Sequence, residues 1–315
     1  MSTLSFILPV FKANYLKEAI NSILNQTFTD FELIIVNDQS PDNISEIVGE
    51  FSDERIKFYE NEVNIGGKDL VENWNRCLVY ATGEWVVLAS DDDYYDPKFA
   101  EKLLDKIQQY PSVSLVHCRY KVINGKDEVI EISEPCLAFE QPEEFVFQNI
   151  IKRRRQVAPD FMFKLADLQQ VGGFVNFPLA WGSDDATWCK LALNAGVAYV
   201  DEILFTWRFS GINISAQQNN VLKKAKTRIH FLAYFNREII PFLKTDNIIA
   251  AYYTKVTQHN LTKSIQGEVV NTIASSRSFK VLFALLKDRA LRELLGIKNL
   301  LKMTFVMLYF RTFKR

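Results

Sequence analysis

The sequence has few residues of the types that build metal clusters or disulfides. Among its 315 residues there are only three histidines and four cysteines, Cys77, Cys118, Cys136 and Cys189. The cysteines are widely separated and no CxxC pair occurs, so their spacing predicts no zinc site. Unpaired cysteines are typical of a reducing compartment, and we therefore expect a cytoplasmic protein.

Long apolar runs, a basic leader and an excess of charge are also missing. No stretch reaches the roughly 18 apolar residues that a membrane-spanning helix requires. The first residues, MSTLSFILPVF, contain no basic segment ahead of an apolar one, so we expect no signal peptide. A net charge of −1 gives no general attraction to nucleic acid, which excludes that class of partner. The 48% content of hydrophobic residues is typical of a folded globular protein.

The charge is nevertheless distributed unevenly. Residues 287–315 contain eight basic and two acidic side chains, which gives this segment +6 and leaves −7 for the rest of a chain whose total is −1. From LRELLGIKNLL onward, apolar residues follow a helical spacing with Lys and Arg between them. A basic amphipathic helix of this kind can lie on an anionic membrane surface. The alternatives are an ordinary packing helix in a bundle and a homodimer interface.

The first hundred residues alternate between strand and helix patterns. Apolar runs predict strands at 4–10, 31–38, 55–60 and 84–90, and the segments between them predict helices at 15–26, 44–51 and 70–81. This order indicates an α/β fold with a doubly wound, mainly parallel sheet and helices on both faces. Ligands of such sheets bind beyond the carboxyl ends of the strands.

The rest of the chain changes character near residue 216. Residues 113–132 predict a hairpin around the turn NGKD, residues 184–195 predict a helix, and residues 198–209 predict another strand or two. From about residue 216 onward only helical periods occur. We therefore expect an α/β domain at 1–215 and an all-helical C-terminal region at 216–315.

Aspartates gather at the predicted ligand edge of the sheet. Asp91, Asp92 and Asp93 directly follow the fourth strand, and Asp38 follows the second. Adjacent carboxylates repel one another, more strongly in a site of low dielectric, unless a cation compensates them. Oxygen ligands suit Mg²⁺ or Mn²⁺. The alternative is a solvated acidic loop in which Asp96 caps the next helix.

A second acidic pair stands at the start of the helix predicted at 184–195. Asp184 and Asp185 lie in its first turn, where carboxylates interact favourably with the helix dipole. That structural role explains the pair fully. The functional alternative is a general base at the rim of an active site, which takes a proton from an acceptor hydroxyl.

Three sequence blocks together resemble a known family. They are SFILPVFKANYLKEAINSILNQTFTDFELIIVNDQSPDN, LASDDDYYDP and WGSDDATWCKLALNAG. These blocks look like the signature segments of the family 2 inverting glycosyltransferases, which have the GT-A fold. The resemblance covers residues 4 to about 215, so it implies a GT-A catalytic domain followed by the helical region.

The resemblance implies donor-binding roles for Pro9, Val10, Phe11, Asp38, Asp91 and Asp92. The first three match the segment that lines the nucleotide, and Asp38 matches the acid that contacts the base. Asp91 and Asp93 match the two acids of the DxD motif. Asp92, between them, is expected near the ribose or sugar of the donor.

The same resemblance implies metal-binding and catalytic residues. Asp93, together with Asp91, is expected to hold Mn²⁺ or Mg²⁺ on the donor diphosphate. Asp184 and Asp185 match the Glu-Asp pair that contains the general base, and Asp185 is favoured. Arg208 matches a basic position after the last core strand.

The implied reaction moves a sugar from a nucleotide-sugar donor, a UDP-sugar first of all, to a hydroxyl of a glycan or a lipid-linked saccharide. The base deprotonates the acceptor, which attacks the anomeric carbon opposite the leaving diphosphate and inverts its configuration. The implied process is surface polysaccharide synthesis. The implied location is the cytoplasm, with peripheral contact to the inner face of the membrane.

Other functions are weighed against this one. A sugar-phosphate nucleotidyltransferase would need a Gly-rich loop with Arg and Lys after the first strand, and PVFKANYL has no glycine. A non-catalytic nucleotide-binding scaffold would be favoured by loss of Asp93 or of both Asp184 and Asp185, which are all present. The basic run KRRRQ, residues 152–156, is interpreted as a solvated turn rather than a phosphate site.

Overall fold

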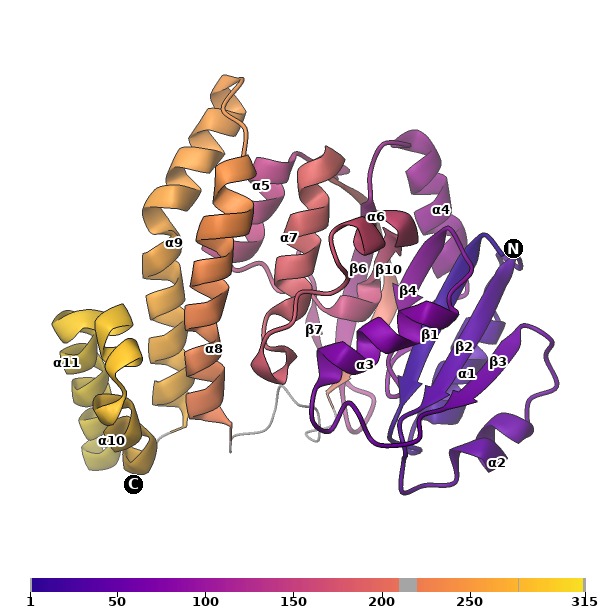
Figure 1. Ribbon diagram of the computed structural model, residues 1–315, viewed down its shortest axis with the longest axis horizontal. Coiled ribbons are helices and arrows are strands. Elements are labelled where there is room, and N and C mark those ends of the chain that lie inside the picture. The colour runs from indigo at the N-terminus through magenta and orange to yellow at the C-terminus, as the bar shows by residue number, and fades with distance from the viewer. Residues whose placement is uncertain (1, 210–219, 277, 314–315) are drawn as a thin grey trace.

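A computed structural model describes residues 2–209, 220–276 and 278–313 of the chain. Figure 1 shows the sheet and its first helices at one end of the molecule and the C-terminal helices at the other. The predicted boundary between the α/β domain and the helical region, at 215/216, lies outside the described residues. Among those residues, no helix combines the length and the apolar character needed to cross a bilayer.

One mixed sheet forms the centre of the α/β part. Its strands are β1 (Leu4–Val10), β2 (Phe31–Asn37), β3 (Ile56–Glu60), β4 (Trp85–Leu88), β5 (Tyr94–Tyr95), β6 (Leu115–Asn124), β7 (Val129–Ile132), β8 (Phe139–Glu140), β9 (Phe161–Lys164) and β10 (Val197–Phe209). The order along the sheet is β3-β2-β1-β4-β9-β6-β10-β5, with β7 beside β6 and β8 beside β10.

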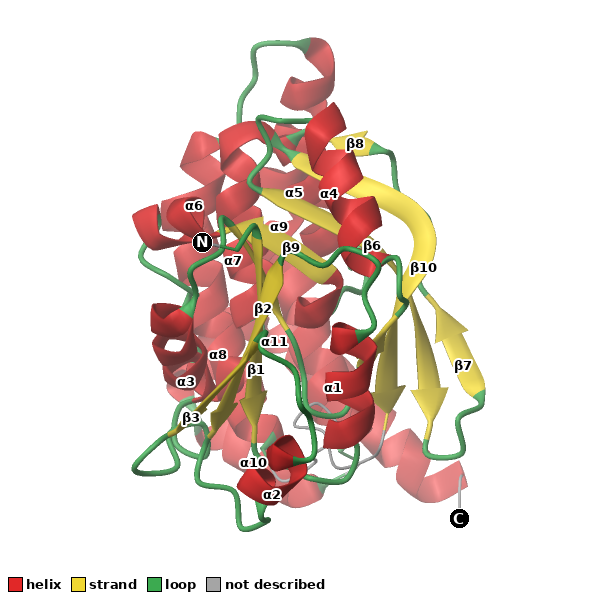
Figure 2. Cartoon of the chain, turned by 90° about the vertical axis from the view of Figure 1, so that its right-hand side faces the viewer, coloured by secondary structure: helices red, strands yellow, loops and turns green. Residues whose placement is uncertain are grey.

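The sheet is parallel where the sequence predicts it most clearly. Strands β3, β2, β1 and β4 are parallel neighbours, and β6 pairs with β10 in parallel. Strand β9, which the sequence did not predict, runs antiparallel between β4 and β6. Figure 2 shows the curl of the sheet in the bent β10, whose pairing with β6 shifts register between Val200 and Phe205. The predicted fold class is confirmed, with a mixed sheet.

Helices cover both faces of this sheet. They are α1 (Leu16–Leu24), α2 (Ile44–Gly49), α3 (Leu70–Cys77), α4 (Phe99–Gln109), α5 (Pro142–Val146), α6 (Leu165–Gln170) and α7 (Ser183–Ala195). Side chains alternate along a strand. Thus Phe6 and Leu8 of β1 join an apolar cluster with α1 and α4, whereas Ile7 joins a second cluster with α3 and α7. Burial on both faces explains the continuous apolar sequence of β1 and β2.

The C-terminal helices are α8 (Val221–Tyr234), α9 (Ile248–Ser275), α10 (Phe279–Lys287) and α11 (Arg289–Phe313). Phe231 of α8 and Leu261 of α9 belong to the same apolar cluster as Ile7 and Trp188, so these two helices share the core of the α/β part. A separate cluster joins α10 and α11 to α8 and α9. The helical character expected for this region is confirmed, whereas its division into a separate domain stays a prediction.

One local expectation needs correction. Asp96 was expected to cap the helix that follows Pro97, but helix α4 begins at Phe99 and its N-cap position is Lys98. The Asp96 carboxylate instead accepts a hydrogen bond from the backbone N–H of Lys98, at 2.9 Å. Aspartate therefore stabilises the turn before the helix, because its short side chain reaches the backbone two residues onward.

Candidate active site

The carboxyl ends of β1, β2 and β4 open into one cleft of about 940 Å³. The cleft is lined by every residue predicted to bind donor or metal or to act as a base: Pro9, Val10, Phe11, Asp38, Asp91, Asp92, Asp93, Asp184 and Asp185. Strand β1 lies between β2 and β4, with Val10 opposite Asn37 and Ile7 opposite Leu88. The residues that follow these three strands therefore meet at one edge of the sheet.

Asp91 joins the end of β1 to the end of β4. Its Oδ2 accepts hydrogen bonds from the backbone N–H groups of Phe11, at 2.9 Å, and Lys12, at 2.8 Å. The Lys12 ammonium lies 3.3 Å from Asp91 Oδ1 and 2.5 Å from Asp92 Oδ2. Burial opposes a charge on Lys12, but the attraction of Asp91 and Asp92 outweighs it and raises the pKa of Lys12. Lys12 is therefore an internal counter-cation of the aspartate cluster.

Asp93 is the most deeply buried of the three aspartates. Its Oδ1 accepts a hydrogen bond from the backbone N–H of Arg208, at 2.8 Å. Burial, followed by the negative charge of Asp92, raises the pKa of Asp93 well above its usual range. The Arg208 side chain binds Glu18 of α1 and Asp127 of the hairpin turn. The predicted basic residue thus fixes the structure around Asp93.

The aspartate cluster fits a divalent cation. Its carboxylates offer oxygen ligands only, and burial is the main cause that raises the pKa of Asp91 and of Asp93. Asp91 uses both of its oxygens on Phe11 and Lys12. Asp93 uses Oδ1 on Arg208, so Oδ2 is the atom that it would offer to a metal.

Asp38 holds the loop that follows β3. Its Oδ1 accepts from the Asn61 side chain, at 2.7 Å, and from the backbone N–H of Ile65, at 2.9 Å. Its Oδ2 accepts from the backbone N–H of Gly66, at 2.7 Å. A Cβ at position 66 would lie 2.8 Å from this oxygen, so the close approach requires glycine. The sequence NIGG, residues 64–67, thus forms the loop before helix α3, which begins at Leu70.

Asp184 and Asp185 line the opposite wall of the cleft, in the first turn of α7. Burial in this wall, together with the charge of Asp185, raises the pKa of Asp184 to about 7. Burial also raises the pKa of Asp185, whereas the Arg228 guanidinium opposes that shift. A pKa of about 7 at Asp184 suits the work of a general base.

The backbone just before this pair is strained. Leu179 and Ala180 adopt φ values of 63° and 53°, a region that L-residues without special support avoid. Gly182 also has a positive φ, and a Cβ there would lie 2.6 Å from Arg228 Nη1. The segment is therefore held against α8 in a conformation that sets where α7 begins. Such strain is common at functional sites.

Helices α8 and α9 also reach the cleft, which the sequence did not predict. Arg228 of α8 and Glu268 of α9 line it beside the Asp184–Asp185 pair and form an ion pair at 2.5 Å. No pattern in the helical region distinguishes these two residues from other surface charges. Lys12 could have been found, because it follows β1 directly at the predicted ligand edge.

The basic run at 152–156 is the predicted exposed turn at Lys152, Arg153 and Arg155, but not at Arg154. Arg154 is partly buried and binds both carboxylate oxygens of Glu140, at 2.7 and 2.5 Å. Arg155 pairs with Glu131 and lines the cleft. The sequence did not reveal these ion pairs, because the acids are distant in sequence and are brought to the arginines only by folding.

Comparison with known proteins decides the family. Residues 5–166, just over half of the chain, match the family described as Glycosyl transferase family 2. The chain belongs to glycosyl transferase family 2. This membership confirms the expected transferase class and excludes the nucleotidyltransferase alternative.

Relatives of this glycosyltransferase agree with that assignment. It is 26% identical over 225 residues to the UDP-Glc:alpha-D-GlcNAc-diphosphoundecaprenol beta-1,3-glucosyltransferase WfgD of Escherichia coli, across 70% of this chain and 82% of that protein. Its structure is similar to that of S. aureus TarS 1–349 in complex with UDP-GlcNAc, with a TM-score of 0.62, 19% identity, and coverage of 99% and 92% of the two chains. The structure is also similar to that of the mannosyltransferase PcManGT of Pyrobaculum calidifontis in complex with GDP-Man and Mn²⁺. The TM-score is 0.57 at 15% identity, with coverage of 100% of this chain and 88% of that chain. These structures share the fold.

The raised pKa of Asp184 predicts a stability that depends on pH. A carboxyl group whose pKa is higher in the folded state stabilises the fold at low pH, and this stability is lost as the pH rises toward about 7. The Asp184→Asn side chain cannot ionise, so the variant does not undergo this loss of stability. We expect the variant to gain on the order of 1 kcal/mol relative to wild type between pH 5 and pH 8, or about 2–4 °C in Tm.

Thermal unfolding at the two pH values measures this effect. Asp105→Asn, on the exposed side of α4, is the matched control and is expected to show no gain that grows with pH. An equal Tm difference between Asp184→Asn and wild type at pH 5 and pH 8 would contradict the raised pKa.

Proposed function

We propose that this glycosyltransferase is metal-dependent and inverting, and that it moves a sugar from a UDP-sugar to a hydroxyl of a lipid-linked saccharide. One observation supports the proposal above all others. A single cleft has an aspartate cluster at the end of β4 on one wall and the Asp184–Asp185 carboxylate pair on the other, with burial raising the pKa of Asp184 to about 7. This arrangement provides a place for a diphosphate and a base for an acceptor in the same cavity.

The donor would occupy the sheet edge. Pro9, Val10 and Phe11 offer it a wall, and Asp38 stands where it could accept a hydrogen bond from the base or ribose. The Lys12 ammonium lies in the same wall, where it pairs with Asp91 and Asp92. We propose that it turns to a phosphate oxygen when the donor binds. The cleft supports this placement because its aspartates and Lys12 are all at the carboxyl edge of the strands.

Asp93 is the residue we propose to hold Mn²⁺ or Mg²⁺, with Asp91 positioning the turn around it. The ion would neutralise the charge that develops on the departing diphosphate. The positive charge of the ion would also compensate the negative charge of the three adjacent, buried carboxylates. This compensation explains how a cluster with unfavourable pKa shifts can persist at the end of a buried strand.

Asp185, or Asp184 with it, would take the proton of the acceptor hydroxyl. The oxygen then attacks the anomeric carbon, the bond to the diphosphate breaks, and the configuration at that carbon inverts. The helix dipole favours the ionised pair, and Arg228 favours ionised Asp185, while burial keeps the pair basic enough to accept a proton. The lipid-linked acceptor is proposed by analogy with the substrate in the name of WfgD, and the UDP-sugar by analogy with WfgD and TarS.

The two acidic sites should separate in a mutational test. Asp93→Asn is expected to abolish stabilisation by UDP-sugar with Mn²⁺ and to lower transfer by about 10²-fold or more. Asp185→Asn is expected to lower transfer by about 10²–10⁴-fold while UDP-sugar still raises the Tm. Thermal shift with a panel of nucleotide sugars, with and without Mn²⁺, and release of nucleoside diphosphate measure the two effects.

Asp105→Asn is the control for both variants and should behave as wild type. If no nucleotide sugar stabilises the wild-type chain or releases diphosphate with Mn²⁺ and a lipid-linked acceptor, the proposal fails. A wild-type chain that binds donor but never transfers would support the non-catalytic scaffold instead.

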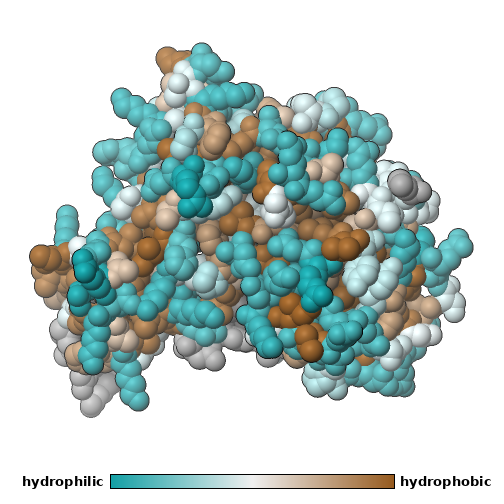
Figure 3. All heavy atoms as spheres, in the orientation of Figure 1, coloured by the Kyte–Doolittle hydropathy of each residue, from teal (hydrophilic) through white to brown (hydrophobic). Residues whose placement is uncertain are grey.

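We also propose that helix α11 rests on an anionic membrane, where a lipid-linked acceptor would be presented. Ile297, Leu301 and Phe305 are 78%, 67% and 71% exposed and are spaced at one residue per helical turn. Lys298 and Lys302 stand beside them, while Leu295 and Met303 pack inward. Figure 3 shows hydrophobic side chains among hydrophilic ones at the end of the molecule that α10 and α11 occupy. The basic neighbours favour an anionic lipid surface as the partner.

Acidic substitution of the stripe tests this contact. The triple variant Ile297→Asp, Leu301→Asp, Phe305→Asp is expected to lose about tenfold or more in binding to vesicles of phosphatidylcholine with phosphatidylglycerol. Ile249→Asp, at the exposed start of α9, is the matched control and should bind as wild type. The contact is absent if wild type does not co-sediment with these vesicles, or if the triple variant only turns a dimer into a monomer.

A further inference from the structure

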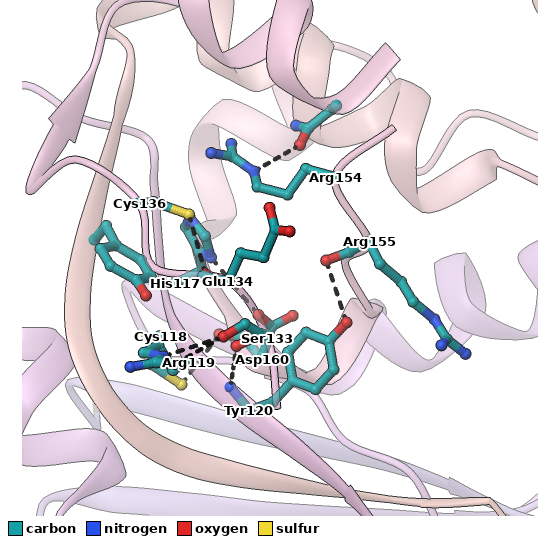
Figure 4. Close-up of polar contacts among 12 residues, drawn as sticks. His117, Cys118, Arg119, Tyr120, Ser133, Glu134, Cys136, Arg154, Arg155 and Asp160 are labelled. Carbon is teal, nitrogen blue, oxygen red and sulfur yellow. Dashed lines mark hydrogen bonds and ion pairs between the residues drawn. The ribbon is translucent and has the colours of Figure 1, made fainter. Parts of the chain in front are cut away.

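A second, much smaller cavity lies outside the cleft. Its volume is about 10 Å³, and its walls include His117, Cys136, Arg154, Gln156 and Asp160. These residues come from β6, the segment before β8, and the segment before β9, as the close-up in Figure 4 shows. A volume of this size holds one water molecule or one ion. The catalytic mechanism uses none of these side chains.

Two residues of the cavity wall, His117 and Cys136, meet a third metal-ligating side chain, Glu140, which lies outside that wall. One ligand atom from each of His117, Cys136 and Glu140 lies within 4.8 Å of the other two. His117 and Glu140 are buried, and Cys136 is half-buried. An imidazole, a thiolate and a carboxylate are all normal zinc ligands, and a set that includes sulfur favours Zn²⁺ over Mg²⁺ or Mn²⁺.

His117 is the residue that points most clearly to a ligand at this place. It is 2% exposed, and neither of its ring nitrogens makes a hydrogen bond of normal geometry to any described residue. Its ring is stacked on Phe161, with centroids 4.7 Å apart, so it has little freedom to turn elsewhere. A buried imidazole without a partner is costly.

Asp160 stands beside the histidine. Its Oδ2 lies 3.6 Å from His117 Nδ1, too far for a hydrogen bond, and Nε2 is the other ring nitrogen, which we assign to the metal. A carboxylate behind a ligating histidine is the usual outer partner of such a ring. Glu140 is held by both terminal nitrogens of Arg154, so its orientation is fixed as well. Each carboxylate oxygen can accept more than one partner, so this ion pair leaves room for a metal bond.

We propose that His117, Cys136 and Glu140 bind one Zn²⁺, with a water molecule in the small cavity as the fourth ligand. Binding forms a Zn–S bond and releases the thiol proton of Cys136 to solvent. The negative charge of the thiolate and that of Glu140, which also pairs with Arg154, face the ion. The site is independent of the metal proposed at Asp93.

The ion would brace one wall of the active-site cleft. Cys136 belongs to the segment between β7 and β8, whereas His117 belongs to β6. Arg155 and Gln156 line both the small cavity and the cleft. A zinc ion that connects β6 to the segment between β7 and β8 would therefore hold this part of the cleft wall in place. We assign the ion a structural role.

Spacing in the sequence hid this site. The three ligands are separated by 19 and 4 residues, which matches no common zinc pattern, and the sequence therefore predicted none. Pairing of β8 with β10, and of β10 with β6, brings Glu140 close to His117. The main competitor is a single buried water, which would satisfy His117 without any metal.

Metal content tests the proposal directly. The full-length chain, expressed with zinc and dialysed without chelator, is expected to retain about one zinc per chain by elemental analysis. Cys136→Ser should lose most of it. Glu134→Gln, which removes a charge from the same cavity wall outside the cluster, and Asp93→Asn should keep it. The zinc should also raise the Tm of wild type but not that of Cys136→Ser.

Cobalt provides a second measurement that does not depend on the variant folding. Wild type in which Co²⁺ replaces zinc should show the near-ultraviolet absorption of a cobalt–thiolate bond. The proposal is overturned if wild type neither retains nor takes up zinc, if the cobalt form lacks this band, or if Cys136→Ser retains as much zinc as wild type. The first of these results would leave the buried water as the occupant.

Discussion

The structure depends on how three adjacent carboxylates are kept at the end of a buried strand. Asp91, Asp92 and Asp93 are all less than 7% exposed, and their mutual repulsion would be costly without compensation. The fold supplies part of it through the Lys12 ammonium and through the backbone N–H groups of Phe11, Lys12 and Arg208. The metal ion that accompanies a donor diphosphate would provide the rest of the charge compensation. Binding and folding are thus linked at one place, because the groups that hold the cluster also hold the ends of β1, β4 and β10.

The second wall of the cleft is held by different means. Helix α7 begins after a strained segment, and Gly182 lets Arg228 of α8 approach its first turn. Arg228 in turn pairs with Glu268 of α9, so helices from the C-terminal part set the electrostatics around Asp184 and Asp185. The helical region is therefore part of the active-site structure as well as a cover for the core. The same helices continue into α10 and α11, whose exposed apolar stripe faces away from the bundle.

Much of this arrangement follows from the sequence, and the reason is local. Parallel strands place their carboxyl ends together, so Asp38 after β2 and Asp91–Asp93 after β4 had to meet beside β1. The part that the sequence hides depends on contacts between distant segments. The four-residue β9 carries no strand signal of its own, and the partners of Arg154, Arg228 and His117 lie at separations that no periodic pattern reveals. Roles for individual aspartates came from family resemblance, since either a cap or a base would explain Asp184 and Asp185 equally well on physical grounds.

The central claim is that the donor lies on the aspartate wall and the base on the opposite wall, so that transfer proceeds by a single displacement. The anomeric configuration of the product tests this claim most directly. With an α-linked UDP-sugar and a lipid-linked saccharide acceptor, the proton NMR spectrum of the first product formed is predicted to show a β-linkage. An α-linked first product would contradict a single displacement and would remove the role assigned to the Asp184–Asp185 pair.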